Sequence, residues 1–142
     1  MNIARILEQR DSTVHTCNRA HGVAEAAQLL AERRIGALPV MDGDEVVGIF
    51  SERDLLYCVA KEGAAALTRS VGEVMTSPPI VVERETGVME ALSLMTRRRV
   101  RHLPVVEGGR MVGMISIGDL VKSRVEQAES EAEAMREYIQ TA

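Results

Sequence analysis

The sequence predicts an α+β fold made of two copies of one motif, related by an approximate twofold axis. A shift of 65 residues aligns positions 14–55 with positions 79–120 without a gap, and seventeen of these 42 pairs are identical. In each copy, short apolar strands alternate with amphipathic helices in the same order, β-α-β-β-α after a leading helix. Because neither copy can cover its small sheet alone, we expect the two to pack sheet to sheet.

The repeat divides the chain into three parts. We expect the first copy with its leading helix over residues 1–66, the second copy over residues 67–122 and a C-terminal helical extension over residues 123–142. Hydrophobic residues make up 46% of the 142 residues, which is enough to bury a core of this size.

Composition also limits the partners. A net charge of −4 and an aromatic content of 2% argue against general nucleic-acid binding and against a stacking platform for single strands. No apolar stretch approaches the length of a membrane span or a secretory h-region, so we expect no membrane partner and a cytoplasmic location.

Each copy begins with a short apolar helix. Residues 3–9 follow Asn2, a favoured N-cap residue, and residues 70–75 have the Ser-x-x-Glu spacing of a capping box. A strand is then expected over residues 14–17 in the first copy and over residues 80–82 in the second.

A longer amphipathic helix begins after Gly22 in the first copy and after Gly87 in the second. Both helices end in arginines and lead into a Leu-Pro-Val strand. The turns at residues 42–44 and 107–109 contain Gly between two apolar runs, which predicts a β-hairpin in each copy. Residues 61–69 are expected to form a short connector between the copies.

After each hairpin the chain places Ser-x-x-Asp at the start of a helix, as Ser51 and Asp54 and again as Ser116 and Asp119. A helix N-terminus favours anions such as phosphate, because its first N–H groups lack helical partners. An aspartate one turn further on can accept hydrogen bonds from the paired hydroxyls of a ribose. Each copy could therefore hold a nucleotide. The alternative is that these residues are only helix caps. A single copy would favour this alternative, whereas the repetition of the motif in both copies favours ligand binding.

The last helix continues past the end of the repeat. Its apolar residues alternate spacings of four and three, a narrow seam typical of a coiled coil. The seam consists of Val121, Val125, Ala128, Ala132, Met135 and Ile139. The helix could lie across its own domain, but the narrow seam favours a partner helix, so we expect a homodimer contact.

Catalysis and metal binding are not indicated. No nucleophile occurs with a base and an orienting group beyond Ser-x-x-Asp, so we do not expect an enzyme. His15 and Cys17 share a strand face, but no third metal ligand is visible. Cys17 and Cys58 are interpreted as small buried residues in a reducing compartment.

These features together resemble a tandem pair of CBS domains, the Bateman module. The resemblance rests on the doubled element order, on the segments 36–40 and 101–105 around Leu-Pro-Val, and on the two Gly-apolar-apolar-Ser-x-x-Asp segments. It implies a regulatory module that binds adenosine-containing ligands, such as AMP, ADP, ATP, NAD or S-adenosylmethionine, in two clefts between the repeats. It also implies homodimers. Since the two repeats fill the chain, the output is expected to act on a separate protein.

The resemblance also implies roles for single residues. Ser51 and Ser116 would contact phosphate, while Asp54 and Asp119 would hold the ribose hydroxyls. The adenine would lie among residues of the first strand and the start of the Leu-Pro-Val strand. These are Val14, Thr16, Ala37 and Pro39 for one cleft, and Ile80, His102 and Pro104 for the other.

The two clefts are expected to differ. Arg53 precedes Asp54 and could bind a phosphate with its guanidinium fork, whereas Gly118 stands at that position in the second copy. Arg101 and His102 make the second cleft more cationic, and Arg101 is a candidate ligand contact. We therefore expect the two clefts to bind different ligands, or the same ligand with different affinities.

Two other functions remain open. The protein could be a dimeric scaffold whose clefts bind nothing. A basic edge at Arg97–Arg99 could meet nucleic acid, although cations at a helix C-terminus are favoured by the dipole in any case.

Overall fold

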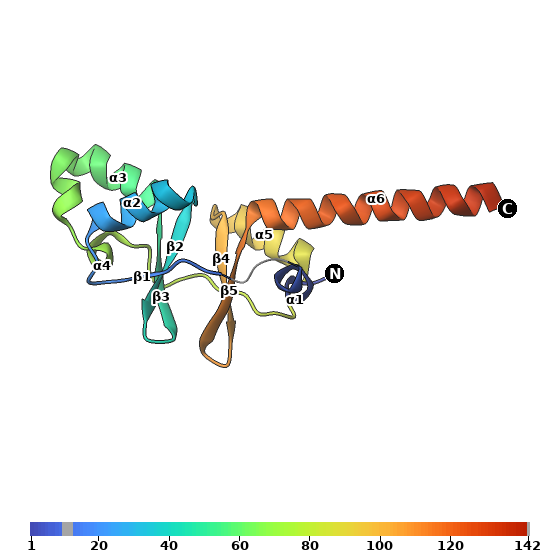
Figure 1. Ribbon diagram of the computed structural model, residues 1–142, viewed down its shortest axis with the longest axis horizontal. Coiled ribbons are helices and arrows are strands. Elements are labelled where there is room, and N and C mark those ends of the chain that lie inside the picture. The colour runs from blue at the N-terminus through green and yellow to red at the C-terminus, as the bar shows by residue number, and fades with distance from the viewer. Residues whose placement is uncertain (10–12, 142) are drawn as a thin grey trace.

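The computed structural model of the chain describes residues 1–9 and 13–141. Two repeats lie side by side, each with a hairpin, and a long helix leaves the body at the C-terminal end (Figure 1). The elements of the first half are α1 (Ile3–Glu8), β1 (Cys17–Asn18), α2 (Val23–Arg33), β2 (Ala37–Asp42), β3 (Glu45–Ser51) and α3 (Glu52–Glu62). Those of the second are the 3-10 helix η1 (Gly63–Thr68), α4 (Val71–Val74), α5 (Val88–Arg98), β4 (His102–Glu107), β5 (Arg110–Ser116) and α6 (Ile117–Thr141). The predicted α+β repeat architecture is confirmed.

The helix starts follow local capping rules. The Arg5 N–H donates to Asn2 Oδ1 at 3.3 Å and caps α1. Ser70 and Glu73 form the predicted capping box of α4. The capping box predicted from sequence therefore sets where this short helix begins.

The hairpins also form as predicted. Strand β2 pairs with β3, and β4 pairs with β5, in antiparallel register with an irregularity at the equivalent place in each repeat. The turns place Gly43, Gly108 and Gly109 at positive φ, a backbone conformation that glycine adopts without steric cost.

The first strands are shorter than predicted, and the prediction for the second repeat is wrong. Only Cys17–Asn18 forms a strand, parallel to β2, and residues 80–82 contribute a single bridge between Val82 and Val105. There the Val82 N–H donates to the Pro104 carbonyl at 3.0 Å, and the Val106 N–H donates to the Val82 carbonyl at 2.9 Å. The preceding hydrogen bond of the parallel ladder, on the N-terminal side of Val82, would need an N–H on Pro104. Proline has none, so the ladder cannot extend in that direction.

The predicted connector is also wrong in detail. Helix α3 continues to Glu62, and η1 occupies Gly63–Thr68. Ala66 is fully buried, so this segment packs against the first repeat and is not a loose link.

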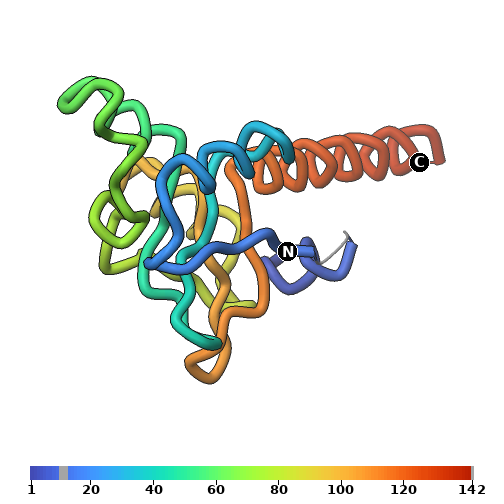
Figure 2. Tube along the Cα trace, turned by 60° about the vertical axis from the view of Figure 1, so that its left-hand side comes forward, coloured from blue at the N-terminus to red at the C-terminus, as the bar shows by residue number. Residues whose placement is uncertain are grey.

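Two separate cores form, and the leading helices cross between them. Ile3 and Ile6 of α1 join the core of the second repeat, which also contains Val88, Leu103, Ile115 and other residues of that half. Val71 of α4 joins the core of the first repeat, around Leu38 and Phe50. In Figures 1 and 2, α1 accordingly lies on the side of the second repeat, near the base of α6. Each repeat therefore depends on the other's leading helix to close its core.

Helix α6 runs without interruption through the predicted start of the extension at residue 123. Leu120 and Ser123 are its buried residues, and most of the remainder is exposed. The helix projects from the body (Figure 1), so the alternative of a tail lying across its own domain is wrong. Ala142, the last residue of the predicted extension, lies outside the described residues. Within residues 1–9 and 13–141, no helix combines the length and apolarity that crossing a membrane requires.

Candidate functional site

The first Ser-x-x-Asp segment forms a closed set of hydrogen bonds. Both the N–H and the hydroxyl of Ser51 donate to Asp54 Oδ2, at 2.8 and 2.9 Å, and the Asp54 N–H donates back to Ser51 Oγ at 3.2 Å. Strand β3 ends at Ser51 and α3 begins at the next residue, so the pair fixes the turn from strand to helix. The capping role considered as the alternative is therefore present in the structure.

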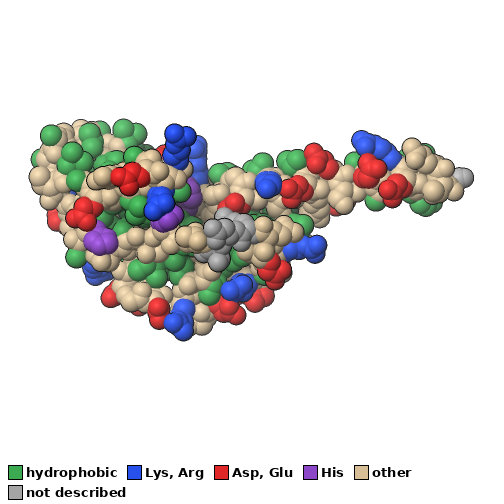
Figure 3. Space-filling model, viewed as in Figure 1, with side chains coloured by type: hydrophobic (Ala, Val, Ile, Leu, Met, Phe, Trp, Pro, Cys, Tyr) green, Lys and Arg blue, Asp and Glu red, His purple; other side chains and the backbone are tan. Residues whose placement is uncertain are grey.

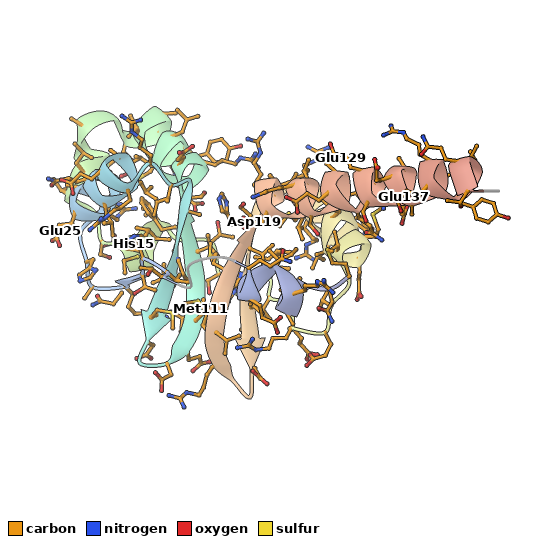
Figure 4. The ribbon with its side chains drawn as sticks, turned by 45° about the vertical axis from the view of Figure 1, so that its right-hand side comes forward. His15, Glu25, Met111, Asp119, Glu129 and Glu137 are labelled. Carbon is orange, nitrogen blue, oxygen red and sulfur yellow. The ribbon has the colours of Figure 1, made fainter. Side chains whose placement is uncertain are left out.

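The second segment repeats this geometry. The Ser116 N–H donates to Asp119 Oδ2 at 2.8 Å, and the Asp119 N–H donates to Ser116 Oγ at 3.2 Å. Figure 4 shows Asp119 where α6 begins. The serine and aspartate of each repeat are thus brought together, with both side chains half-buried.

Some N–H groups at these helix starts already have partners. The Glu52 N–H donates to the Gly36 carbonyl at 3.0 Å, and the Ile117 N–H donates to the Arg101 carbonyl at 2.8 Å. The N–H groups of Asp54 and Asp119 also have partners, so the expectation of free donors is wrong for the first and third residues of each helix. An anion would have to be held by fewer backbone donors than the sequence suggested, with side chains supplying the rest.

His102 lies where the two repeats meet. A Cβ added to Gly36 would come within 2.9 Å of His102 Cε1, so the ring of one repeat packs directly on the glycine of the other. Burial lowers the pKa of His102, the negative charges of Glu52 and Asp119 raise it in part, and Arg101 lowers it further. The pKa of this histidine remains below its usual value, because loss of water disfavours the charged ring.

Arg53 also connects the repeats. Its Nη1 donates to the carbonyl of Arg99 at 2.9 Å, at the end of α5 in the other repeat. Arg99 has a φ of 54° there and caps the helix in the left-handed conformation, as Arg34 does in the first repeat with a φ of 53°. A guanidinium has five N–H donors, so Arg53 keeps others that could face a phosphate.

Most of the residues expected around adenine have little exposed surface. Ala37, Pro39 and Pro104 are buried in the hairpins, and Ile80 packs against the core of the second repeat. Thr16 is exposed just before β1, and Val14 is half-buried.

The comparisons with known proteins agree with this architecture. Residues 10–61 and residues 71–126 each match the CBS domain family. The chain belongs to the CBS-domain family. The predicted tandem pair of CBS domains is confirmed.

Several CBS-domain proteins are similar over most of this chain. The mitochondrial CBS domain-containing protein CBSX3 of Arabidopsis thaliana is 36% identical over 129 residues, which cover 87% of this chain and 63% of that protein. The crystal structure of the CBS-domain containing protein ATU1752 from Agrobacterium tumefaciens has a TM-score of 0.84 and 39% identity, and the match covers 87% and 99% of the two chains. The CBS domain protein PAE2072 from Pyrobaculum aerophilum, complexed with AMP, has a TM-score of 0.74 and 27% identity over 84% and 89%.

Thr76 and Glu52 lie beside the predicted site residues Asp54 and His102 and were not found from the sequence. The Thr76 hydroxyl donates to Asp54 Oδ1 at 2.8 Å from a segment 22 residues away. No motif marks Thr76, because its role depends on α4 packing on the first repeat. Glu52 precedes Arg53 in the Ser-x-x-Asp segment, and its absence from the second copy, which has Ile117, was a signal that could have been used.

Proposed function

We propose that this CBS-domain pair is a regulatory module that binds an adenosine nucleotide, of the AMP, ATP or NAD type, and acts on a separate protein. The supporting observation is that both repeats hold the same serine and aspartate together at a strand end, within hydrogen-bond distance of each other. The AMP complex of the similar PAE2072 structure supports the ligand class. We further propose that the chain is not an enzyme.

In the proposed complex, Asp54 and Asp119 accept hydrogen bonds from ribose hydroxyls while keeping their cap hydrogen bonds. A carboxylate has about four acceptor positions, and Asp54 already uses three of them for Ser51 and Thr76, so one ribose hydroxyl would take the fourth and a second would replace the Thr76 hydroxyl. The hydroxyls of Ser51 and Ser116, with Arg53 in the first cleft and Arg101 in the second, meet the phosphate. The base of the nucleotide lies beside residues of the first strand and of the Leu-Pro-Val strand. In one cleft these are Val14, Thr16, Ala37 and Pro39, and in the other Ile80, His102 and Pro104.

A ligand that contacts both repeats favours one relative arrangement of them. It can shift that arrangement only by the difference between its affinities for the two states. The Arg53 contact with Arg99 and the His102 contact with Gly36 join the repeats beside the proposed clefts. These contacts are therefore the ones that a bound nucleotide would change and pass on to a partner protein.

The test is thermal denaturation with AMP, ATP, NAD, S-adenosylmethionine and, as a control, GMP. A ligand that binds only the folded state at a hundredfold excess over its Kd stabilises it by about 2.7 kcal/mol. A higher Tm with adenosine compounds and not with GMP is the expected result. No shift at millimolar concentrations of any of them would contradict the proposal.

Matched variants separate ligand binding from capping. Asp54→Ala and Asp119→Ala should each remove part of the ligand-induced shift. Glu73→Ala breaks a capping box of the same kind in α4, and it should lower the Tm without changing the shift. If Glu73→Ala reduces the shift as much as the other two, the aspartates act only through stability.

A homodimeric scaffold with clefts that bind nothing is the second candidate. It is favoured by the capping box, which already uses both side chains of Ser51 and Asp54. If no ligand raises the Tm and the protein is a stable dimer, the scaffold function would be supported.

The two free thiols, Cys17 and Cys58, support a reducing compartment, and we propose the cytoplasm.

A further inference from the structure

The outer part of α6 has an apolar seam that its own chain does not cover. Val121 and Val125 are 48% and 49% exposed, and Met135 and Ile139 are 59% and 66% exposed. Ala128 and Ala132, which complete the seam, are exposed as well. Figure 1 shows this part of the helix projecting from the body, and Figure 3 shows both hydrophobic and charged side chains along it. Most helical stability in proteins comes from packing of an apolar face, so a partner for the seam would stabilise this part of α6.

The seam lies on a different side of α6 from the face that packs on the body. Leu120 and Ser123 are buried and Gln127 is half-buried, so positions 120, 123 and 127 define the inner face. At 100° per residue, this face points about 130° away from the line through Val121, Val125 and Ala128. A second helix can therefore approach the seam without displacing α6 from its own domain.

We propose that the seam binds the same helix of a second copy of this chain, as a parallel two-stranded coiled coil. The spacing assigns Val125, Ala132 and Ile139 to the a positions of the heptad, and Val121, Ala128 and Met135 to the d positions. β-Branched residues at two of the three a positions, with no Ile at the d positions, are compatible with two strands.

The charges beside the seam specify the parallel orientation. In a parallel pair, each g position faces the e position five residues further along the partner helix. Arg124 then faces Glu129 of the partner subunit, and Glu131 faces Arg136 of the partner subunit. The twofold axis doubles both pairs, so all four contacts join opposite charges. Figure 4 shows Glu129 on the projecting part of α6, outside the body.

The antiparallel orientation brings like charges together. With the seams fully overlapped, Glu129 would face Glu129 of the partner subunit, and Glu131 would face Glu131 of the partner subunit. Lys122 would face Arg136 of the partner subunit, so each of these pairs is repulsive. Shifting an antiparallel pair by one heptad in either direction relieves the repulsion, but it aligns only four of the six seam residues.

Within one chain, Arg136 contacts Glu133 at 3.3 Å, and Glu131 accepts a hydrogen bond from Gln127. Both pairs are exposed, and exposed pairs of this kind contribute little. They can exchange for contacts across the seam, where the side chains lie beside apolar residues. A parallel coiled coil also places the two CBS bodies at the same end of the dimer, beside one another.

Disulfide trapping tests the arrangement in the full chain. Ile139→Cys is made with Cys58→Ser, because Cys58 is only half-buried, and is incubated with oxidised glutathione. A parallel pair brings the two introduced thiols together, whereas full antiparallel overlap separates them by roughly 27 Å. Glu137→Cys, on the outer face two residues away, is the matched control. We expect Ile139→Cys to form an interchain disulfide at least tenfold faster, and equal or absent crosslinking would overturn the proposal.

A charge swap tests the register independently. Arg124→Glu or Glu129→Arg alone should slow the crosslinking of Ile139→Cys and raise the dimer Kd, measured by analytical ultracentrifugation, by about tenfold. The double variant Arg124→Glu with Glu129→Arg should restore both. In the antiparallel pair shifted toward the body, the double variant would repel at every pair, so failure to restore would overturn the parallel arrangement. The parallel arrangement would also be overturned if neither Arg124→Glu nor Glu129→Arg alone changed the crosslinking of Ile139→Cys while the dimer persisted.

Discussion

The Thr76 hydroxyl donates a 2.8 Å hydrogen bond to Asp54 Oδ1, while Oδ2 of the same carboxylate accepts from Ser51. Thr76 follows α4, which packs on the core of the first repeat. The aspartate proposed to bind ribose in the first cleft is therefore oriented from two sides, by its own helix cap and by the segment that joins the repeats.

Thr76→Val should lower the free energy of unfolding by about 1 kcal/mol, since it removes one hydrogen bond at an exposed position. In a double-mutant cycle with Asp54→Ala, we expect a coupling energy of similar size. Urea denaturation measures both. Thr86→Val is the control, because the Thr86 hydroxyl accepts a local hydrogen bond from the Glu83 N–H and lies in the other repeat. Coupling as large for Thr86 as for Thr76 would show that the cycle reports general destabilisation.

Gly48 and Gly113 occupy equivalent places in the two repeats but face different obstacles. A Cβ on Gly48 would meet the Thr76 carbonyl oxygen at 2.9 Å and Met75 Sδ at 2.6 Å, whereas a Cβ on Gly113 would meet the flexible end of Leu7 at 2.9 Å. Gly48→Ala should therefore cost about 2 to 3 kcal/mol and Gly113→Ala about 1 kcal/mol. Leu7→Ala should offset part of the cost at Gly113. Equal costs at both glycines in urea denaturation would contradict the assignment of the backbone carbonyl as the stronger obstacle.

Acid should destabilise the protein through His102. Its pKa is lowered in the folded state by burial, so the unfolded chain binds a proton more readily. Stability should accordingly be full above the ordinary histidine pKa of about 6.5 and decrease as the pH falls below it, until the lower folded pKa is reached. His102→Asn should reduce the slope of unfolding free energy against pH in this window. His21→Asn, at an exposed position, is the control, and an unchanged slope in His102→Asn would contradict the prediction.

The left-handed helix caps offer a stabilising change. Arg34 ends α2 with φ 53° and ψ 46°, a conformation that is unfavourable for residues with a Cβ. Arg34→Gly should raise the unfolding free energy by about 1 kcal/mol. Arg33→Gly, one residue earlier and inside the helix, should lower it by about 0.5 to 1 kcal/mol. A loss of stability in Arg34→Gly would indicate that the Arg34 side chain stabilises the fold by more than the left-handed backbone conformation destabilises it.

The features predicted correctly are those that depend on neighbouring residues in the sequence. The capping box at Ser70, the hairpin turn at Gly43 and the doubled element order each follow from a local rule and need no knowledge of the partner surface. The strand predicted over residues 80–82 does not form, because the missing N–H of Pro104 matters only once Val82 lies beside it. The limits of the repeats at residues 66 and 122 remain a prediction.

For the candidate site, the sequence located Ser51 with Asp54 and Ser116 with Asp119, which the structure brings within hydrogen-bond distance. It could not show that Thr76 reaches Asp54, because that contact requires α4 to pack on the other repeat. Nor could it show that Gly36 makes room for His102, since the two belong to different repeats. Contacts that cross the pseudo-twofold axis leave no local signal.

The crossing of α1 to the second repeat has a consequence for how the chain folds as it is made. Ile3 and Ile6 need Leu103 and Ile115 as packing partners, and these residues leave the ribosome after about a hundred others. At about 5 to 20 residues per second, α1 waits for roughly 5 to 20 seconds without its native site. Helix α4 (Val71–Val74) is made before Leu103 and Ile115, so the core of the first repeat can take up α4 during that interval, whereas the core that receives α1 closes only near the end of synthesis.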